Sequence, residues 1–103
     1  MDAVDGFSLR VGKETDGTVV RLSGELDIAS APMLDECLES LDGEAVTIDF
    51  ANLTFIDSSG LQVLVQRHRK DGAAPLVLRR VQPSQMKVFM VTGLDELFNF
   101  DGE

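Results

Sequence analysis

The sequence predicts a single α/β domain over residues 1–103, with a mixed sheet of four to five strands and three to four helices. Three observations support this fold class. The chain opens with the pattern of a β-hairpin, apolar β-type runs then alternate with amphipathic helical runs, and the length suits one domain. Because strands separated by helices imply right-handed parallel crossovers, we expect an antiparallel edge strand and a parallel remainder.

The hairpin occupies the N-terminal part of the chain. Residues 7–13 alternate apolar and polar side chains, as in a strand with one buried face. Asp16 and Gly17 are a strong turn signal, and residues 18–23 form the expected return strand. Residues 24–27 are expected to be the turn that ends the hairpin.

A first helix is predicted after this turn. Ser30 is its expected N-cap, Pro32 lies in its first turn, and Gly43 ends it. Apolar residues at spacings of three and four define its core face: Met33, Leu34, Cys37, Leu38 and Leu41. The position of Cys37 on this face predicts a buried thiol rather than a reactive one.

A second strand–helix pair follows. Residues 45–50 form a continuous β-type run, residues 61–70 have helical spacing, and Asp71 with Gly72 is expected to stop the helix. The packed side of this helix is predicted to comprise Leu61, Val63, Leu64, Val65 and His68. Its water-facing side is predicted to comprise Gln66, Arg67, Arg69 and Lys70.

The C-terminal third is predicted to contain one more strand, at residues 75–79, and a third helix at residues 84–92. The expected core face of that helix comprises Met86, Phe89 and Met90. Gly93 is its expected stop, and residues 94–98 are compatible with a short helical turn.

The net charge of −9 argues against non-specific binding to nucleic acid. The first 57 residues hold 13 acids and 3 bases, whereas residues 58–93 hold 6 bases and 1 acid. A local basic patch and an ordinary solvated basic face both fit this distribution. No apolar run approaches the roughly 20 residues that span a bilayer. Because the N-terminus does not have the features of a secretion signal and there is one cysteine, we expect a cytoplasmic protein.

The sequence Asp-Ser-Ser-Gly at residues 57–60 lies where a strand passes into a helix. Asp57 is expected to cap this helix, and Ser58 to present its hydroxyl at the first helical position. A phosphate on that hydroxyl would meet free backbone N–H groups and the positive end of the helix dipole. The same residue types are common at ordinary helix starts, so both interpretations stay open from these four residues alone.

Two loops are expected at the carboxyl ends of parallel strands, at residues 24–27 and 52–60. If the two strands are neighbours, Glu25 and Asp27 come near Ser58. These carboxylates, together with Asp49 and Asp57, could bind a divalent ion, but an acidic surface is the simpler interpretation.

A wider pattern surrounds this motif. Residues 55–61, preceded by a strand that ends at Phe50, resemble the anti-sigma-factor antagonists of the STAS-domain family. The turn at residues 24–27 and the pair Gly93-Leu94 fall in the family's order, so the resemblance covers nearly the whole chain. Gln62 stands where the family often has glycine. The resemblance implies a STAS fold with Ser58 as the phosphorylation site.

The resemblance also implies a phosphoprotein that regulates transcription in a stress response. Such a protein binds an anti-sigma factor that is also a serine kinase and so releases a sigma factor. The kinase phosphorylates Ser58 to end the complex, and a serine phosphatase resets it. The expected partner-binding residues are Glu25, Asp27, Asp57, Ser58, Ser59, Gly60 and Leu61. No cofactor, metal, nucleic acid or membrane is expected as a partner.

The alternatives are a STAS scaffold of a larger signalling assembly, a transporter-type STAS regulatory domain, or a small serine hydrolase. Catalysis is not expected. His68, the only histidine, is three helical turns from Ser58, about 15 Å along the axis, which is too far for a nucleophile–base hydrogen bond. One cysteine and one histidine cannot build a zinc site.

Overall fold

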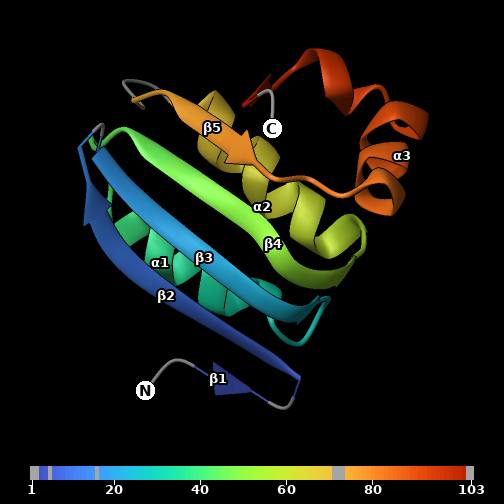
Figure 1. Cartoon of the computed structure of the whole chain (residues 1–103), viewed down its shortest axis with the longest axis horizontal. Helices are drawn as coiled ribbons and strands as arrows, with labels where there is room; N and C mark the ends of the chain where they lie inside the picture. Colours follow the sequence, from blue (N-terminus) through green and yellow to red (C-terminus); the bar gives the residue numbers. More distant parts are fainter. Residues whose placement is uncertain (1–2, 5, 16, 71–73, 102–103) are drawn as a thin grey trace.

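The computed structural model describes residues 3–4, 6–15, 17–70 and 74–101. One six-stranded sheet runs in the order β1-β2-β3-β4-β5-β6. Helices α1 and α2 lie side by side across one face of this sheet, and α3 lies beyond the end of β5 (Figure 1). The elements are β1 (Ala3–Val4), β2 (Phe7–Glu14), β3 (Gly17–Leu26), α1 (Ala31–Ser40), β4 (Val46–Ile56), α2 (Ser58–Arg69), β5 (Leu76–Arg79), α3 (Pro83–Val91), the 3-10 turn η1 (Leu94–Glu96) and β6 (Asn99–Phe100).

The predicted fold class is confirmed. The β1–β2 and β2–β3 pairs are antiparallel, and the β3–β4, β4–β5 and β5–β6 pairs are parallel. The sheet has six strands in the described residues rather than four to five, because the two-residue strands β1 and β6 add one at each edge. Such short strands carry too little pattern to be recognised in a sequence.

Strand β3 is longer than predicted, and the expected turn at residues 24–27 is wrong for its first three positions. Gly24 has a φ of +92°, and a Cβ there would lie 1.8 Å from the carbonyl oxygen of Gly6. The backbone N–H of Glu25 donates to that same oxygen at 2.8 Å. Glycine therefore keeps β3 against the β1–β2 turn and allows the strand to continue to Leu26. Asp16, the first residue of the predicted hairpin turn, lies outside the described residues.

Strand β4 is also longer than predicted, because residues 52–56 continue to pair with β3 instead of forming a loop. Asn52 lies beside Ser23, and Ile56 lies beside Leu26, with register irregularities between them. The expected loop at residues 52–60 is thus reduced to Asp57, which joins β4 directly to α2. The junction has little freedom, because both of its sides are regular structure.

The core lies between the sheet and its helices. Leu34 of α1 and Leu64 of α2 are fully buried against the sheet, as is Phe50 of β4. Phe89 of α3 makes edge-on ring contacts to Phe50, Phe98 and Phe100, at centroid distances of 6.2, 5.9 and 5.4 Å. This aromatic cluster fixes α3 over the carboxyl end of the sheet.

The placement of three helix residues differs from the prediction. Ser30 precedes α1 but makes no side-chain capping bond. Cys37 is half-buried rather than buried, because it packs at the margin of the core. Met90 is 60% exposed, since α3 packs through Phe89 and Gln85 and turns its next residue to water.

Arg67 was expected to face water but is 6% exposed. Its Nη1 donates to the Ala74 carbonyl at 2.9 Å and its Nη2 to the Glu44 carbonyl at 2.8 Å. Ala74, just before β5, and Glu44, just before β4, thus lie over the end of α2, and the guanidinium is buried because it donates to both carbonyls. The predicted stop at Asp71 and Gly72 lies outside the described residues. Among the helices that the structure describes, none combines the length and apolar character needed to cross a bilayer.

Candidate functional site

The β4–α2 junction is organised by Asp57. Its backbone is extended, and its Oδ1 accepts from the N–H groups of Ser59 at 2.9 Å and Gly60 at 3.3 Å. Its own N–H donates to the Leu26 carbonyl at 3.1 Å, which ties the ends of β3 and β4 together. Asp57 is therefore the N-cap of α2, as predicted from the sequence.

Ser58 is the first residue of α2 and its side chain is exposed. Among the residues that the structure describes, none shares a hydrogen bond with its hydroxyl. The expectation that a phosphate on Ser58 would meet free backbone donors is wrong for the N–H groups of Ser59 and Gly60, because Asp57 occupies both. A negative group there would lie beside an existing carboxylate.

Gly60 and Leu61 are buried. A Cβ on Gly60 would lie 2.7 Å from Leu26 Cδ2 and 3.1 Å from Ile56 Cγ1, so only glycine lets α2 pack this closely on the strand ends. Leu61 is 4% exposed. Both residues therefore hold the helix start in position beneath Ser58, and neither offers a contact surface of its own.

The end of β3 lies next to this junction, because β3 and β4 are parallel neighbours. Asp27 Oδ1 accepts from the N–H groups of Ala29 at 3.0 Å and Ser30 at 3.2 Å, so it holds the turn into α1. Glu25 is exposed, but its carboxylate lies close to Gly6, on the side of β2. The structure thus brings the backbone of Asp27 and Asp57 to one rim and turns Glu25 toward the other neighbour.

Apolar side chains are exposed on both sides of the junction. Ile28, just after β3, is 78% exposed, and Phe55, near the end of β4, is 48% exposed. A groove between α1 and α2 is lined by Ile28, Ala31, Pro32, Asp35, Ser59, Gln62, Val63 and Gln66. The exposure of these two apolar residues was not predicted, because Ile28 stands in a short turn and Phe55 in an expected loop, and neither segment has a periodicity that assigns a side chain to a face.

His68 is half-buried, with its ring centroid 5.4 Å from that of Phe98 in an edge-on contact. It lies near the opposite end of α2 from Ser58. In the described part of the chain, no cluster of three or more histidine, cysteine, aspartate or glutamate side chains could hold a metal ion. The site offers a hydroxyl, carboxylates and apolar surface, which suit protein binding.

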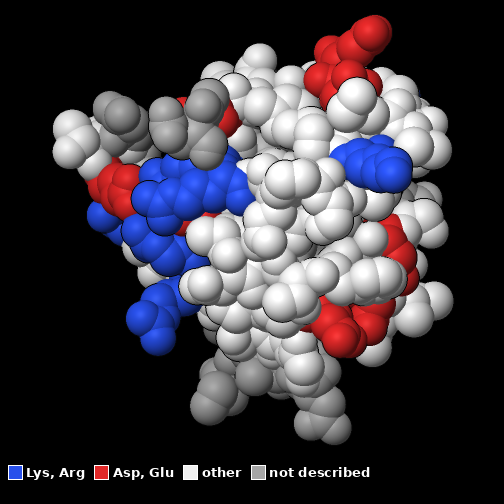
Figure 2. Space-filling model, turned by 45° about the vertical axis from the view of Figure 1, so that its right-hand side comes forward, with Lys and Arg blue, Asp and Glu red and all other residues white. Residues whose placement is uncertain are grey.

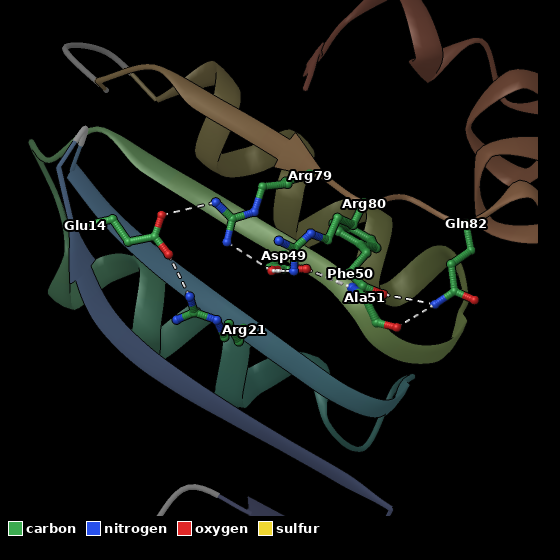
Figure 3. A network of polar contacts seen from close by, with 8 residues as sticks. All are labelled: Glu14, Arg21, Asp49, Phe50, Ala51, Arg79, Arg80 and Gln82. Carbon is green, nitrogen blue, oxygen red and sulfur yellow. Dashed lines mark hydrogen bonds and ion pairs between the residues drawn. The ribbon is translucent and has the colours of Figure 1, made fainter. Parts of the chain in front are cut away.

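A polar network on the sheet was not predicted (Figure 3). Asp49 is 3% exposed, and its Oδ2 is 3.0 Å from Arg79 Nη2 and 3.3 Å from Arg80 Nη1. Burial acts to raise the pKa of Asp49, but hydrogen bonds from the Ala51 N–H and Arg79 outweigh it and hold the pKa below its usual value. Arg79 also donates to Glu14 at 3.2 Å, and that bond lowers the pKa of Glu14.

Comparison with known proteins agrees with this architecture. A sequence model of the family described as "Mlab, STAS domain" matches residues 9–99. The chain belongs to the STAS domain family. Its relatives include the anti-sigma-B factor antagonist of Listeria monocytogenes, 29% identical over 99 residues, covering 88% of this chain and 87% of that protein. The anti-sigma-B factor antagonist of Bacillus subtilis is 30% identical over 88 residues, with coverage of 82% and 81%.

Solved structures of anti-sigma factor antagonists superpose on all or most of the chain. An anti-sigma factor antagonist from Mycobacterium paratuberculosis is 27% identical with a TM-score of 0.80, covering 100% of this chain and 92% of that one. The unphosphorylated form of the anti-sigma factor antagonist SpoIIAA is 25% identical with a TM-score of 0.74, covering 93% and 90%. The family expected from residues 55–61 is thereby confirmed.

Proposed function

We propose that this STAS domain is an anti-sigma factor antagonist: it binds an anti-sigma factor that is also a serine kinase, and so releases a sigma factor in the cytoplasm. The observation that carries this proposal is the exposed hydroxyl of Ser58 at the first position of α2, flanked by exposed Ile28 and Phe55. Its relatives with this role in their names support it.

The partner would bind the rim formed by Asp27, Asp57, Ser58 and Ser59, with Ile28 and Phe55 supplying apolar contact. Burial of two large apolar side chains contributes most of the affinity in contacts of this kind. The protein acts in this scheme by binding alone, and the kinase activity belongs to the partner.

Phosphorylation of Ser58 would end this complex through charge. A phosphate brings nearly two negative charges at neutral pH and would stand beside the Asp57 carboxylate. Because Asp57 already occupies the Ser59 and Gly60 N–H groups, the helix start can compensate little of that charge. A partner surface that presents carboxylates or apolar groups is then repelled, while the fold beneath persists. A serine phosphatase would restore binding.

A pull-down from cells of the source organism tests the proposal. Wild type and Ser58→Ala are expected to recover an anti-sigma factor with a kinase domain, and Ser58→Asp to recover at least about tenfold less. Ser84→Asp is the matched control, because Ser84 is also exposed in the first turn of a helix. Equal recovery by wild type and Ser58→Asp would contradict the charge mechanism, and recovery of no anti-sigma factor by any form would contradict the function.

A further inference from the structure

The face of the sheet that carries no described helix holds a concentration of arginines. In Figure 1, α1 and α2 lie behind β2, β3 and β4, and the face turned to the viewer is open. Lys and Arg side chains gather on one side of the molecule in Figure 2. We define the arginine face as Arg10, Arg21, Arg79 and Arg80. We infer that it is a docking surface for a short acidic segment of a partner protein, separate from the Ser58 rim.

The strand register places this face across four strands. Arg10 of β2 lies directly opposite Arg21 of β3, Arg21 lies beside Asp49 of β4, and Asp49 lies beside Arg79 of β5. Because side chains at paired positions point to the same face, these four form one row across the sheet. Arg80 follows directly and reaches back to Asp49.

The row carries more positive charge than its own carboxylates neutralise. Arg21 Nη2 contacts Glu14 at 2.6 Å, and Arg79 bridges Glu14 at 3.2 Å and Asp49 at 3.0 Å. In the part of the chain that the structure describes, the ion pairs of the arginine face set two carboxylates against its four guanidinium groups, which leaves a local excess of two positive charges on a protein of net charge −9. The Arg80 side chain is 56% exposed and Arg10 is exposed, so both can reach a carboxylate of a bound partner.

Two local features of this row, one of charge and one of backbone conformation, are unfavourable for stability. Arg10 and Arg21 are like charges at directly opposed positions of an antiparallel pair. Arg80 has a φ of +58°, in the left-handed region that residues other than glycine rarely occupy. Residues that break local rules without a packing gain mark functional surfaces more often than structural ones. Arg80 in this conformation reaches Asp49, and an anionic ligand placed between Arg10 and Arg21 would offset the repulsion between them.

The chemistry selects an acidic protein segment as the ligand. Arginine forks match carboxylates in a bidentate geometry. Long polyanions such as nucleic acid, and anionic membranes, extend past a patch of this size and would meet the acidic remainder of the molecule. A segment with a few glutamates or aspartates fits the row. Asp49 precedes Asp57 by eight residues along β4, about 25 Å of strand, so the two surfaces are distinct.

Binding of a fluorescein-labelled hexaglutamate peptide, followed by fluorescence anisotropy, tests the inference. Wild type should bind it saturably, with an affinity that falls as salt rises from about 50 to about 300 mM, and hexaglutamine should not bind. Arg10→Gln with Arg80→Gln should weaken binding at least about tenfold. Arg69→Gln with Lys87→Gln removes the same charge from exposed positions on α2 and α3 and should change it less than about twofold.

Several outcomes would overturn the inference: the absence of saturable binding, equal loss in both double variants, or tighter arginine-dependent binding to duplex DNA or to phosphatidylserine vesicles. Thermal unfolding verifies that both variants are folded. Amide chemical shifts should move on β2 to β5 and stay fixed around Ser58. Ser58→Asp should bind the peptide as wild type does, so failure of the proposed function and failure of this inference give different results.

Discussion

The β3–α1 and β4–α2 junctions are adjacent in space and built in a similar way, yet their serines differ in exposure and in hydrogen bonding. At each junction the strand is followed by an aspartate whose Oδ1 accepts from the N–H groups of the next residues, Asp27 after β3 and Asp57 after β4. Ser30 is 1% exposed, and its Oγ donates to the Glu25 carbonyl at 2.8 Å and accepts from the Asp27 N–H at 2.9 Å. Ser58 is exposed, at the surface of the second junction.

The comparison teaches that residue type alone does not make a modifiable serine. After Asp27 the chain takes three further residues before α1, and this detour folds Ser30 back onto the strand end. After Asp57 the helix begins at once, because the glycine at position 60 lets α2 settle directly on Leu26 and Ile56. The shorter connection leaves Ser58 exposed, without a hydrogen-bond partner for its hydroxyl among the described residues.

The largest expected difference between the two junctions is in phosphorylation. With a partner kinase, ATP and Mg²⁺, wild type should take up one phosphate per chain at Ser58, and Ser58→Ala none, because Ser30 is inaccessible. Intact-mass and peptide mass spectrometry measure this. Phosphate on Ser30 or on Ser59 would contradict the predicted difference between the two junctions.

The tightness of the second junction can be tested with Gly60→Ala. The added methyl would lie 2.7 Å from Leu26, so the free energy of unfolding should fall by about 1–3 kcal/mol in urea titrations. Gly12→Ala is the control, because its Cβ would meet Arg21 Nη1 at an ordinary 3.5 Å. The control should change stability by less than about 0.5 kcal/mol. Equal effects would show that the close packing at the start of α2 is not needed.

Replacing each of the two serines with alanine should also have different effects on the free energy of unfolding. Ser30→Ala removes two part-buried hydrogen bonds, to the Glu25 carbonyl and from the Asp27 N–H, at a cost of about 1–3 kcal/mol. Ser58→Ala removes no bond and should cost less than about 0.5 kcal/mol. Chemical unfolding of both variants at neutral pH decides the matter. A large loss in Ser58→Ala would mean that its hydroxyl has a structural role.

A smaller effect concerns a third aspartate, which holds arginines instead of a helix start. Hydrogen bonding keeps the pKa of Asp49 below its usual value despite burial, so the stability that its charge contributes is complete above about pH 4. That stability should be lost as pH falls through the lowered pKa. Unfolding free energies from pH 7 to pH 2 should therefore fall less steeply below pH 4 in Asp49→Asn than in wild type, whereas the exposed Asp101→Asn should follow wild type. A curve for Asp49→Asn parallel to that of wild type would contradict the assigned role of the arginines.

The elements with strong periodicity could be predicted from the sequence, and so could the cap at Asp57. The Asp-Ser-Ser-Gly run identified the helix start because capping is a local interaction. The extent of β3 and β4 could not be predicted, since residues 52–56 pair through backbone contacts with a distant strand. Tertiary pairing overrides the weak local signal of such segments.

Side chains that serve long-range contacts were the other source of error. Arg67 has the sequence position of a solvent-facing residue near the end of a helix, and its burial follows from long-range hydrogen bonds to the carbonyls of Glu44 and Ala74. The row from Arg10 to Arg79 depends on the register of four strands, which no single stretch of sequence encodes. The exposed Ile28 and Phe55 became recognisable as a surface only when their strands were seen to end side by side.

Helix α2 is anchored at both ends. Arg67 ties its last turn to the carbonyls of Glu44 and Ala74, and Gly60 seats its first turn against Leu26 and Ile56. A helix held by contacts at both ends has little room to shift or tilt in response to a charge added at its N-terminus. Under the proposed function, a phosphate on Ser58 would therefore act on the docking partner rather than on the fold, and its removal would restore the original binding surface.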